Sequence, residues 1–183
     1  MDRDLVVRAQ RGDRDAFASL VDEVSDSLYA VAHRILRDPG LAEDALQNAL
    51  VLTWRRLPHL REPERFAAWC HRILVHACYD EADRRRSWRA NVRVLPVEGP
   101  AGLDSTHVIA DRDELDRAFR RLPIEQRAVF VLHHYVGLPL VEVAELLEIP
   151  AGTARSRLHY AMHGLRVELA PNIDVAVQEG RLA

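Results

Sequence analysis

The chain has 183 residues and a mass of 20.8 kDa, enough for one medium-sized domain or two small ones. All 25 of its basic residues are Arg, and 28 acidic residues leave a formal net charge of −3. Its 48% hydrophobic and 29% charged residues exclude a collagen-like, disordered or disulfide-rich chain. The slightly acidic total also argues against nucleic-acid binding, because domains of that class usually carry a basic surplus.

The cysteines and the N-terminus indicate a compartment. Two cysteines, Cys70 and Cys78, are too few for a disulfide framework and fit a reducing cytosol. The sequence from Met1 to Asp4 lacks the basic start and the apolar core of a signal peptide. No apolar run approaches the length that spans a bilayer. We therefore expect a soluble cytoplasmic protein.

Helical periodicity dominates the first half of the chain. Apolar residues recur at three- and four-residue steps from Phe17 onward, with Asp13 and Asp15 as candidate N-caps. Gly12 is expected to end a short helix before them. Two prolines and a charge cluster predict a loop at Pro58–Pro63. The expected helices of this half span about twenty residues from Ala16, then Leu41–Leu57, then about Glu64–Arg86.

A linker and a second helical set follow. Two prolines and two glycines interrupt any apolar period between Ala90 and Ala110, which predicts a linker between two domains. Residues from Pro171 are expected to be frayed or loosely docked. No segment alternates with period two over enough length to predict a strand, so the fold class is all-α, with two small helical domains. The second helical set is expected at Asp113–Leu122, Pro123–Tyr135 with Pro123 as the first helical residue, Leu140–Leu147 and about Pro150–Leu169.

The net charge of −3 is distributed unevenly along the chain, and this changes the conclusion about nucleic-acid binding. Residues 61–93 carry a net charge of +3 and residues 151–167 also carry +3, whereas residues 94–116 between them carry −5. Screening limits electrostatic attraction to about 8–10 Å at physiological salt, so a phosphate responds to local charge. Most arginine runs such as Arg84–Arg93 are solvated faces. The distribution nevertheless allows one DNA-binding segment in each domain.

Residues 141–160 have the pattern of a helix-turn-helix. Val141–Leu147 is a short amphipathic helix, Glu148–Pro150 interrupts it, and a basic helix without acidic residues begins near Gly152. The second helix of such a motif enters the major groove, where Arg bonds guanine and Ser or His bonds several base edges. A helical hairpin in a protein core has a similar pattern, so the motif alone leaves both structures open.

Two sets of motifs together resemble a known family. One set lies at Ala42–Gln47, Trp54-Arg55, Phe66–Trp69 and Arg72-Ile73. The other lies at Leu122–Phe130, Gly137-Leu138, Val143–Pro150 and Gly152–His159. In order and spacing they resemble regions 2 and 4 of the extracytoplasmic-function (ECF) sigma factors, the small two-domain members of the sigma-70 family. The resemblance spans about residues 13–168 and implies a region 2 domain over 1–89, an acidic linker over 90–110, a region 4 domain over 111–170 and a tail over 171–183.

The resemblance implies transcription initiation. A protein of this family binds core RNA polymerase, directs it to a promoter, recognises the −35 element with its C-terminal helix-turn-helix and melts the −10 element with its N-terminal domain. It is not an enzyme, and it needs no cofactor or metal. The acidic linker resembles the family's segment that threads the active-site and RNA-exit channels of the polymerase. The partners implied are core polymerase, promoter DNA and an anti-sigma factor, with no membrane contact and no small-molecule substrate.

The resemblance also implies roles for individual residues. The polymerase-binding residues are expected on the 41–57 helix, at Asp44, Gln47, Asn48, Leu50 and Arg55. Melting holds a flipped base against side chains, with Arg near the phosphates. The −10 residues are expected to be Arg61, Arg65, Trp69, Arg72, His76, Arg84 and Arg85. The −35 element is expected to be bound by Arg155, Ser156, His159 and Tyr160, with Thr153 and Arg157 as phosphate contacts.

Several residues depart from the usual pattern of the family. Asn48 stands where an acidic residue is usual, and His76 stands where Asn is common. The run Asp80–Asp83 is more acidic than usual, so this part of the helix is expected to repel phosphate. Tyr160 and Met162 occupy positions often held by Arg, which is expected to weaken the electrostatic share of −35 binding and to alter the sequence recognised.

A metal or redox site is the alternative interpretation of Cys70, His71, His76 and Cys78. Structural zinc usually takes closely spaced ligand pairs, whereas the two cysteines lie eight residues apart, so we expect buried cysteines and a DNA-facing His76. The aromatic residues Trp54 and Trp69 and the adjacent histidines His133 and His134 also have interpretations as packing residues. Trp54 is assigned to the core, Trp69 is either a core or a base-stacking residue, and one of the adjacent His133 and His134 is expected to face solvent while the other packs.

An ordinary transcription regulator is the second function hypothesis. Its helix-turn-helix would bind DNA, and its N-terminal domain would sense a ligand or dimerise. An enzyme has no support, because the sequence offers no Gly-rich phosphate loop, no nucleophile–base spacing and no carboxylate pair. The two remaining hypotheses differ in one requirement, since a sigma factor acts through core polymerase and a regulator binds DNA without it.

Overall fold

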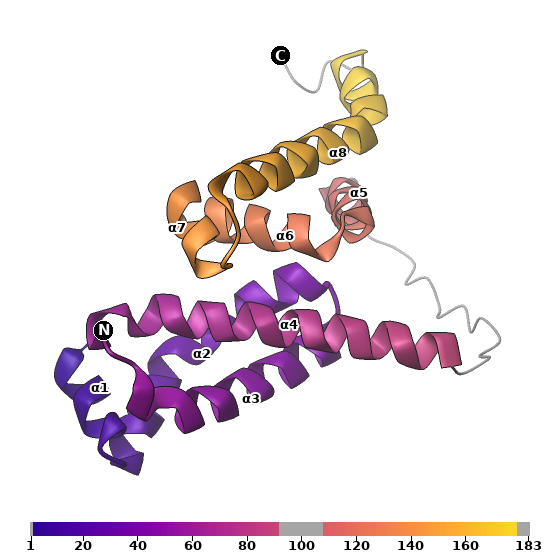
Figure 1. Ribbon diagram of the computed structural model, residues 1–183. Coiled ribbons are helices and arrows are strands. Elements are labelled where there is room, and N and C mark those ends of the chain that lie inside the picture. The colour runs from indigo at the N-terminus through magenta and orange to yellow at the C-terminus, as the bar shows by residue number, and fades with distance from the viewer. Residues whose placement is uncertain (1, 92–107, 179–183) are drawn as a thin grey trace.

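The computed structural model describes residues 2–91 and 108–178, with side chains described for 2–88 and 115–169 (Figure 1). Within these ranges the chain consists of helices and short turns and contains no strand, which confirms the all-α prediction. The helices extend into both ends of the predicted linker, because one runs to Asn91 and the next begins at Val108. The remainder of the predicted linker lies outside the described residues.

Four α-helices and two 3-10 turns make up the first half. Their starts follow from short polar residues that accept hydrogen bonds from free backbone N–H groups. The Asp13 carboxylate accepts from the Ala16 N–H at 3.0 Å, as predicted, whereas Asp15 lies inside the helix. Asp38 accepts from the Leu41 N–H at 3.0 Å. The elements are α1 (Arg3–Gln10), α2 (Arg14–Leu36), α3 (Pro39–Arg56), η1 (Leu57–His59), η2 (Pro63–Arg65) and α4 (Phe66–Asn91).

Two predicted boundaries in this half were wrong. The predicted loop Pro58–Pro63 contains part of two 3-10 turns, because a proline fits the first turn of a helix where its missing N–H costs nothing. The predicted third helix stops at Arg86, whereas α4 continues to Asn91. Its polar C-terminal part has no apolar period that could have indicated this extension.

The second half forms a second helical set. Pro123 precedes its helix as the N-cap residue, with an extended ψ of 143°, so its prediction as the first helical residue was wrong. The backbone stays helical to Gln178, which excludes fraying over 171–178, whereas loose docking, the other predicted alternative, stays a prediction. The elements are α5 (Val108–Arg121), α6 (Ile124–Phe130), the π-helical turn η3 (Val131–Tyr135), α7 (Leu140–Leu146) and α8 (Ala151–Gln178).

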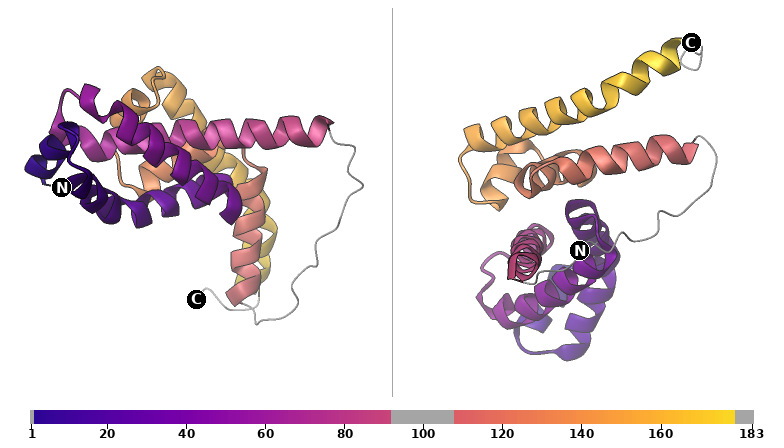
Figure 2. Two further views of the ribbon diagram at one scale, coloured as in Figure 1. Left: turned by 90° about the horizontal axis from the view of Figure 1, so that it is seen from below. Right: turned by 90° about the vertical axis from the view of Figure 1, so that its right-hand side faces the viewer.

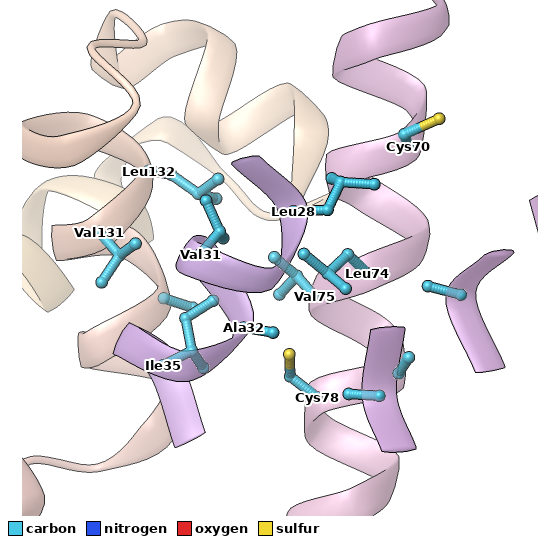
Figure 3. Packing of buried hydrophobic residues seen from close by; sticks show 14 of the residues in the cluster. Leu28, Val31, Ala32, Ile35, Cys70, Leu74, Val75, Cys78, Val131 and Leu132 are labelled. Carbon is cyan, nitrogen blue, oxygen red and sulfur yellow. The ribbon is translucent and has the colours of Figure 1, made fainter. Parts of the chain in front are cut away.

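The two helical sets pack against each other as two layers (Figures 1 and 2). α6 and η3 lie on α2, and α7 lies on α4. Val31 and Ile35 of α2 and Val131 and Leu132 of η3 are all buried, and Figure 3 shows them between the two layers. One continuous apolar cluster therefore runs through both sets and holds the helix-turn-helix beside α4.

Candidate nucleic-acid interface

The helix-turn-helix consists of α7, a tight turn and α8. Glu148 ends α7 in the left-handed conformation, with φ of 54°. The Ile149 N–H donates to the Ala144 carbonyl at 3.0 Å, and the Thr153 N–H donates to the Pro150 carbonyl at 2.8 Å, so the turn has its own hydrogen bonds. Its buried side is made by Val143, Ala144, Leu146, Ala154, Ala161 and Leu165. These contacts fix the angle between α7 and α8 and leave the opposite face of α8 uncovered.

Four of the predicted −35 residues share that uncovered face. Arg155, Ser156, His159 and Tyr160 are all exposed, and Tyr160 is 60% exposed. Their spacing of one, three and one residues places them on one side of the helix. The His159 and Tyr160 rings lie 5.7 Å apart, and the Ser156 hydroxyl donates to the Thr153 carbonyl at 3.0 Å. The structure therefore groups one cation, one hydroxyl and two polar rings on an open surface.

The two predicted phosphate contacts lie differently. Thr153 and Arg157 are half-buried. Burial raises the pKa of Tyr79 on α4 to about 12, and the charge of Arg157 acts in the opposite direction. Arg157 therefore faces α4 across the junction between the layers.

The predicted −10 residues near the start of α4 also form a group. Trp69, Arg72 and His76 follow at three- and four-residue steps, which places them on one side of α4. His76 is exposed, and Trp69 is half-buried with its ring 6.2 Å from that of Phe66. The Arg72 guanidinium donates to the Glu148 carboxylate in the turn of the helix-turn-helix. Arg61 and Arg65 are exposed in the segment that leads into α4.

The arginines further along α4 are held in ion pairs. Arg84 pairs with Glu81 at 3.1 Å, and Arg85 donates to Asp38 at the start of α3. The hydrogen bond from Arg85 is the main reason that the pKa of Asp38 is lowered. Arg86 pairs with Asp83 at 3.4 Å. These cations are partly neutralised within their own domain.

Of the acids in the run 80–83, Asp80 and Asp83 are exposed and Glu81 is not, so the prediction that this run repels phosphate stays a prediction for those two and does not apply to Glu81. This side chain is buried, at 4% exposure, and the Asn48 amide donates to its carboxylate at 2.6 Å. Glu81 thus joins α3 to α4 instead of facing DNA. Sequence reasoning missed this pair, although an amide at a usually acidic position and an additional acid on the next helix were both visible.

The other predicted polymerase-binding residues lie along α3. Asp44, Gln47 and Arg55 are exposed, and Leu50 is half-buried against the core. The side-chain N–H group of Asn48 donates a hydrogen bond to Glu81, so a partner protein would contact the remaining polar atoms of this side chain. The exposed members form a polar surface on the side of α3 away from α2 and α4.

The cysteines, the histidine pair and Trp54 are explained by packing within the protein. Cys70 and Cys78 are buried, as predicted, and burial raises the pKa of each thiol to about 12. His133 shares a 2.9 Å hydrogen bond with the Leu138 carbonyl, whereas His134 is exposed, which confirms the prediction for that pair. Trp54 is half-buried and packs on Phe17 with a ring separation of 4.7 Å.

Two properties of the described residues bear on ligands and membranes. Among the described side chains, those of residues 2–88 and 115–169, there is no group of three or more His, Cys, Asp or Glu arranged to hold a metal ion. In the same ranges no helix combines the length and the hydropathy that crossing a membrane requires.

Comparison with known proteins decides the family. The family model described as Sigma-70 region 2 matches residues 20–89, and that described as Sigma-70, region 4 matches residues 112–162. The ECF RNA polymerase sigma factor SigM of Mycobacterium tuberculosis strain H37Rv is 31% identical over 85% of this chain and 78% of its own length. This chain belongs to the ECF sigma factors.

Other similar proteins agree with this assignment. The RNA polymerase sigma-E factor of Streptomyces avermitilis is 34% identical to this sigma factor, over 84% of each chain. The structure of CnrH in complex with the cytosolic domain of CnrY matches 93% of this chain and 97% of CnrH at a TM-score of 0.66. Its 24% identity supports the fold alone. The protein is an alternative sigma factor, which acts with core RNA polymerase in promoter-specific transcription initiation.

Proposed function

We propose that α8 binds the −35 element and that α4, with the segment before it, binds and melts the −10 element. The observation that carries this proposal is the open face of α8, where Arg155, Ser156, His159 and Tyr160 are exposed together. Arg donates two hydrogen bonds to guanine, and hydroxyl and imidazole groups bond several base edges in the major groove. The absence of acidic residues from 151 to 167 favours contact with phosphate.

The −10 element is proposed to meet the face of α4 that carries Trp69, Arg72 and His76. A melted strand needs a ring for base stacking and cations for its phosphates. Trp69 offers the ring, and Arg61 and Arg65 offer exposed cations beside it. Arg72 joins them when its ion pair with Glu148 is broken. Arg84 and Arg85 exchange their protein carboxylates for phosphates at the far end.

Polymerase binding is proposed for the exposed side of α3, through Asp44, Gln47, Asn48, Leu50 and Arg55. This division assigns residues 1–89 to polymerase binding and the −10 element, 90–110 to a linker and 111–170 to the −35 element, with 171–183 as a tail. The chain catalyses no reaction itself and works in the cytoplasm, where core polymerase is found. An anti-sigma factor is proposed as a further partner, because the sigma factor RpoE of Bartonella quintana was solved in complex with the anti-sigma factor NepR.

Selection from a randomised promoter library tests the assignment of the two elements. Core polymerase loaded with this sigma factor selects duplexes, which are then sequenced. We expect Arg155→Ala to change base preferences in the upstream element only, and His76→Ala to change them in the downstream element only. Arg14→Ala, an exposed arginine on α2, is the control and should change neither. A change of the downstream preferences by Arg155→Ala would contradict the assignment.

A further inference from the structure

A cavity of about 600 Å³ lies where α2 meets α5, α6 and η3. Its walls come from residues 33–37 of the first helical set and 115–135 of the second, so it forms only when the two sets are packed together. None of the residues proposed to bind DNA or polymerase lines it. Its volume falls in the range of small-molecule sites, about 300–1,000 Å³.

The charged groups around this cavity are mostly cationic. Arg34 and Arg37 line it together with one carboxylate, Asp116. Arg37 and Arg120 both pair with that carboxylate, and the Arg120 Nε lies 2.7 Å from an Asp116 oxygen. Two guanidinium groups therefore share this acid, and that of Arg34 lies at the same cavity. Burial, and next the charges of Arg120 and Arg34, lower the pKa of Arg37.

Arg37 also has an unused donor. Its Nε is buried, and no hydrogen-bond partner for it occurs among the described residues. A buried N–H without a partner costs free energy that an incoming acceptor recovers. The neighbouring acid Asp38 is already bonded to Arg85 and does not supply that acceptor.

Aromatic rings form the remaining walls. Phe119, Phe130 and Tyr135 line the cavity, and the Phe119 and Phe130 rings lie 5.1 Å apart. The Arg34 guanidinium lies 3.6 Å from the centre of the Tyr135 ring, and that of Arg37 lies 5.6 Å from the centre of the Phe119 ring. Such surfaces accept a flat apolar ring. Two histidines, His33 and His134, add no negative charge.

We propose that this cavity binds a small organic anion that carries an aromatic ring. The acid group of the ligand accepts hydrogen bonds from Arg37 and meets the charges of Arg34 and Arg120, and its ring packs against Phe119 and Phe130. Because both helical sets supply the walls, the ligand stabilises their packed arrangement. This inference concerns a separate site and does not depend on the proposed assignment of the promoter elements.

Titration of the full chain with 8-anilinonaphthalene-1-sulfonate, an aromatic sulfonate whose fluorescence rises in apolar sites, tests the inference. N-phenyl-1-naphthylamine, which lacks the sulfonate, is the matched probe. We expect saturable binding of the sulfonate and at least about tenfold weaker binding of the uncharged probe, since hydrogen bonds to charged groups contribute that much affinity. Equal affinities for the two probes would overturn the proposal.

Two substitutions separate ligand binding from simple packing of the helical sets. Arg37→Gln should weaken sulfonate binding about tenfold. Asp116→Asn should strengthen it, because the competing carboxylate is removed. If the substitutions acted only by separating the two sets, both would weaken binding, and that result would overturn the proposal. Arg86→Gln, at an exposed site on α4, is the control and should leave the affinity unchanged.

A substitution that fills the cavity tests the same site if the Arg37→Gln protein does not fold. Leu115 lines the cavity and is 45% exposed, so a larger side chain is tolerated there. Leu115→Trp should reduce sulfonate binding while leaving the unfolding midpoint of the protein unchanged. Sulfonate binding that is unaffected by Leu115→Trp would place the probe elsewhere and would overturn the proposal.

Discussion

The helices α4 and α8 both carry arginines toward the proposed DNA surfaces, but they hold them differently. On α4, Arg72, Arg84 and Arg85 are each paired with a carboxylate. On α8, Arg155 has no ion-pair partner within the part of the chain that the structure describes. A paired arginine must give up its carboxylate before it binds phosphate, whereas an unpaired one gives up only water and counterions. The comparison teaches that the residue type alone does not measure the readiness of a helix to bind DNA.

The largest expected effect concerns the unpaired arginine. Arg155→Ala should weaken binding to a selected −35 duplex by about 1–3 kcal/mol and relax specificity at the base that it contacts. The slope of log affinity against log salt should fall in magnitude by about one. Fluorescence anisotropy of a labelled duplex, titrated at several salt concentrations, measures both. Arg14→Ala should reproduce the unmodified protein, and an unchanged isotherm for Arg155→Ala would remove this residue from the interface.

The next effect concerns the buried acid that pairs with Arg84. Asn48→Asp replaces a donor 2.6 Å from the Glu81 carboxylate with a second carboxylate. We expect the free energy of unfolding to fall by about 1–3 kcal/mol at neutral pH, because Glu81 loses the hydrogen bond from the Asn48 amide and gains a like charge beside it. Urea denaturation measures the change. Gln47→Glu adds the same charge at the adjacent exposed position and should change stability by less than about 0.5 kcal/mol.

A smaller effect is expected from pH at the junction of the two layers. Burial, and next the charges of Arg37, Arg34 and Arg120, lower the pKa of His33 from its ordinary value of 6.5, whereas Asp38 acts in the opposite direction. The unfolded chain therefore binds this proton more readily than the folded protein. Stability should fall as the pH drops below about 6.5.

Urea denaturation at pH 7.5 and 5.5 measures this loss of stability. His33→Gln should make it smaller, since the substituted side chain does not titrate. His59→Gln, at an exposed histidine in η1, is the matched control and should leave the loss as it is. A His33→Gln protein with the pH dependence of the unmodified one would refute the role of His33.

The smallest effect concerns the ion pair that joins α4 to the helix-turn-helix. Arg72 is half-buried and Glu148 is exposed at the surface, so their interaction should contribute only about 0.2–1 kcal/mol. A double-mutant cycle with Arg72→Gln and Glu148→Gln isolates this coupling from the effects of each change alone. A coupling energy of zero would show that the pair does not hold the two layers together in solution.

The sequence predicted the local structure well wherever a short-range rule applied. The Asp13 cap, the breaks near Pro39 and Pro123 and the helix-turn-helix at 140–160 all depend on residues within one or two turns. The failures have physical reasons as well. Pro171 normally ends a helix, yet the backbone of α8 continues past it, and the π-helical turn at Val131–Tyr135 has no periodic signal.

The candidate site was predicted less completely, because its geometry depends on distant partners. Periodicity placed Arg155, Ser156, His159 and Tyr160 on one helix face, and the structure groups them there. No short-range rule predicts that Glu81 is buried beside Asn48, or that Arg72 meets Glu148 across 76 residues. Such contacts arise from packing of α3 on α4 and of α7 on α4, which a single sequence does not encode in any short motif.

Run-off transcription with purified core RNA polymerase tests the central claim most directly. The template is a duplex promoter selected from the randomised library. We expect a transcript with one start site when core polymerase and this chain are both present, none with core polymerase alone, and a strongly reduced amount with Arg155→Ala. Binding of the chain to that duplex without polymerase, together with no transcript from the complete mixture, would contradict the account and favour an ordinary transcription regulator.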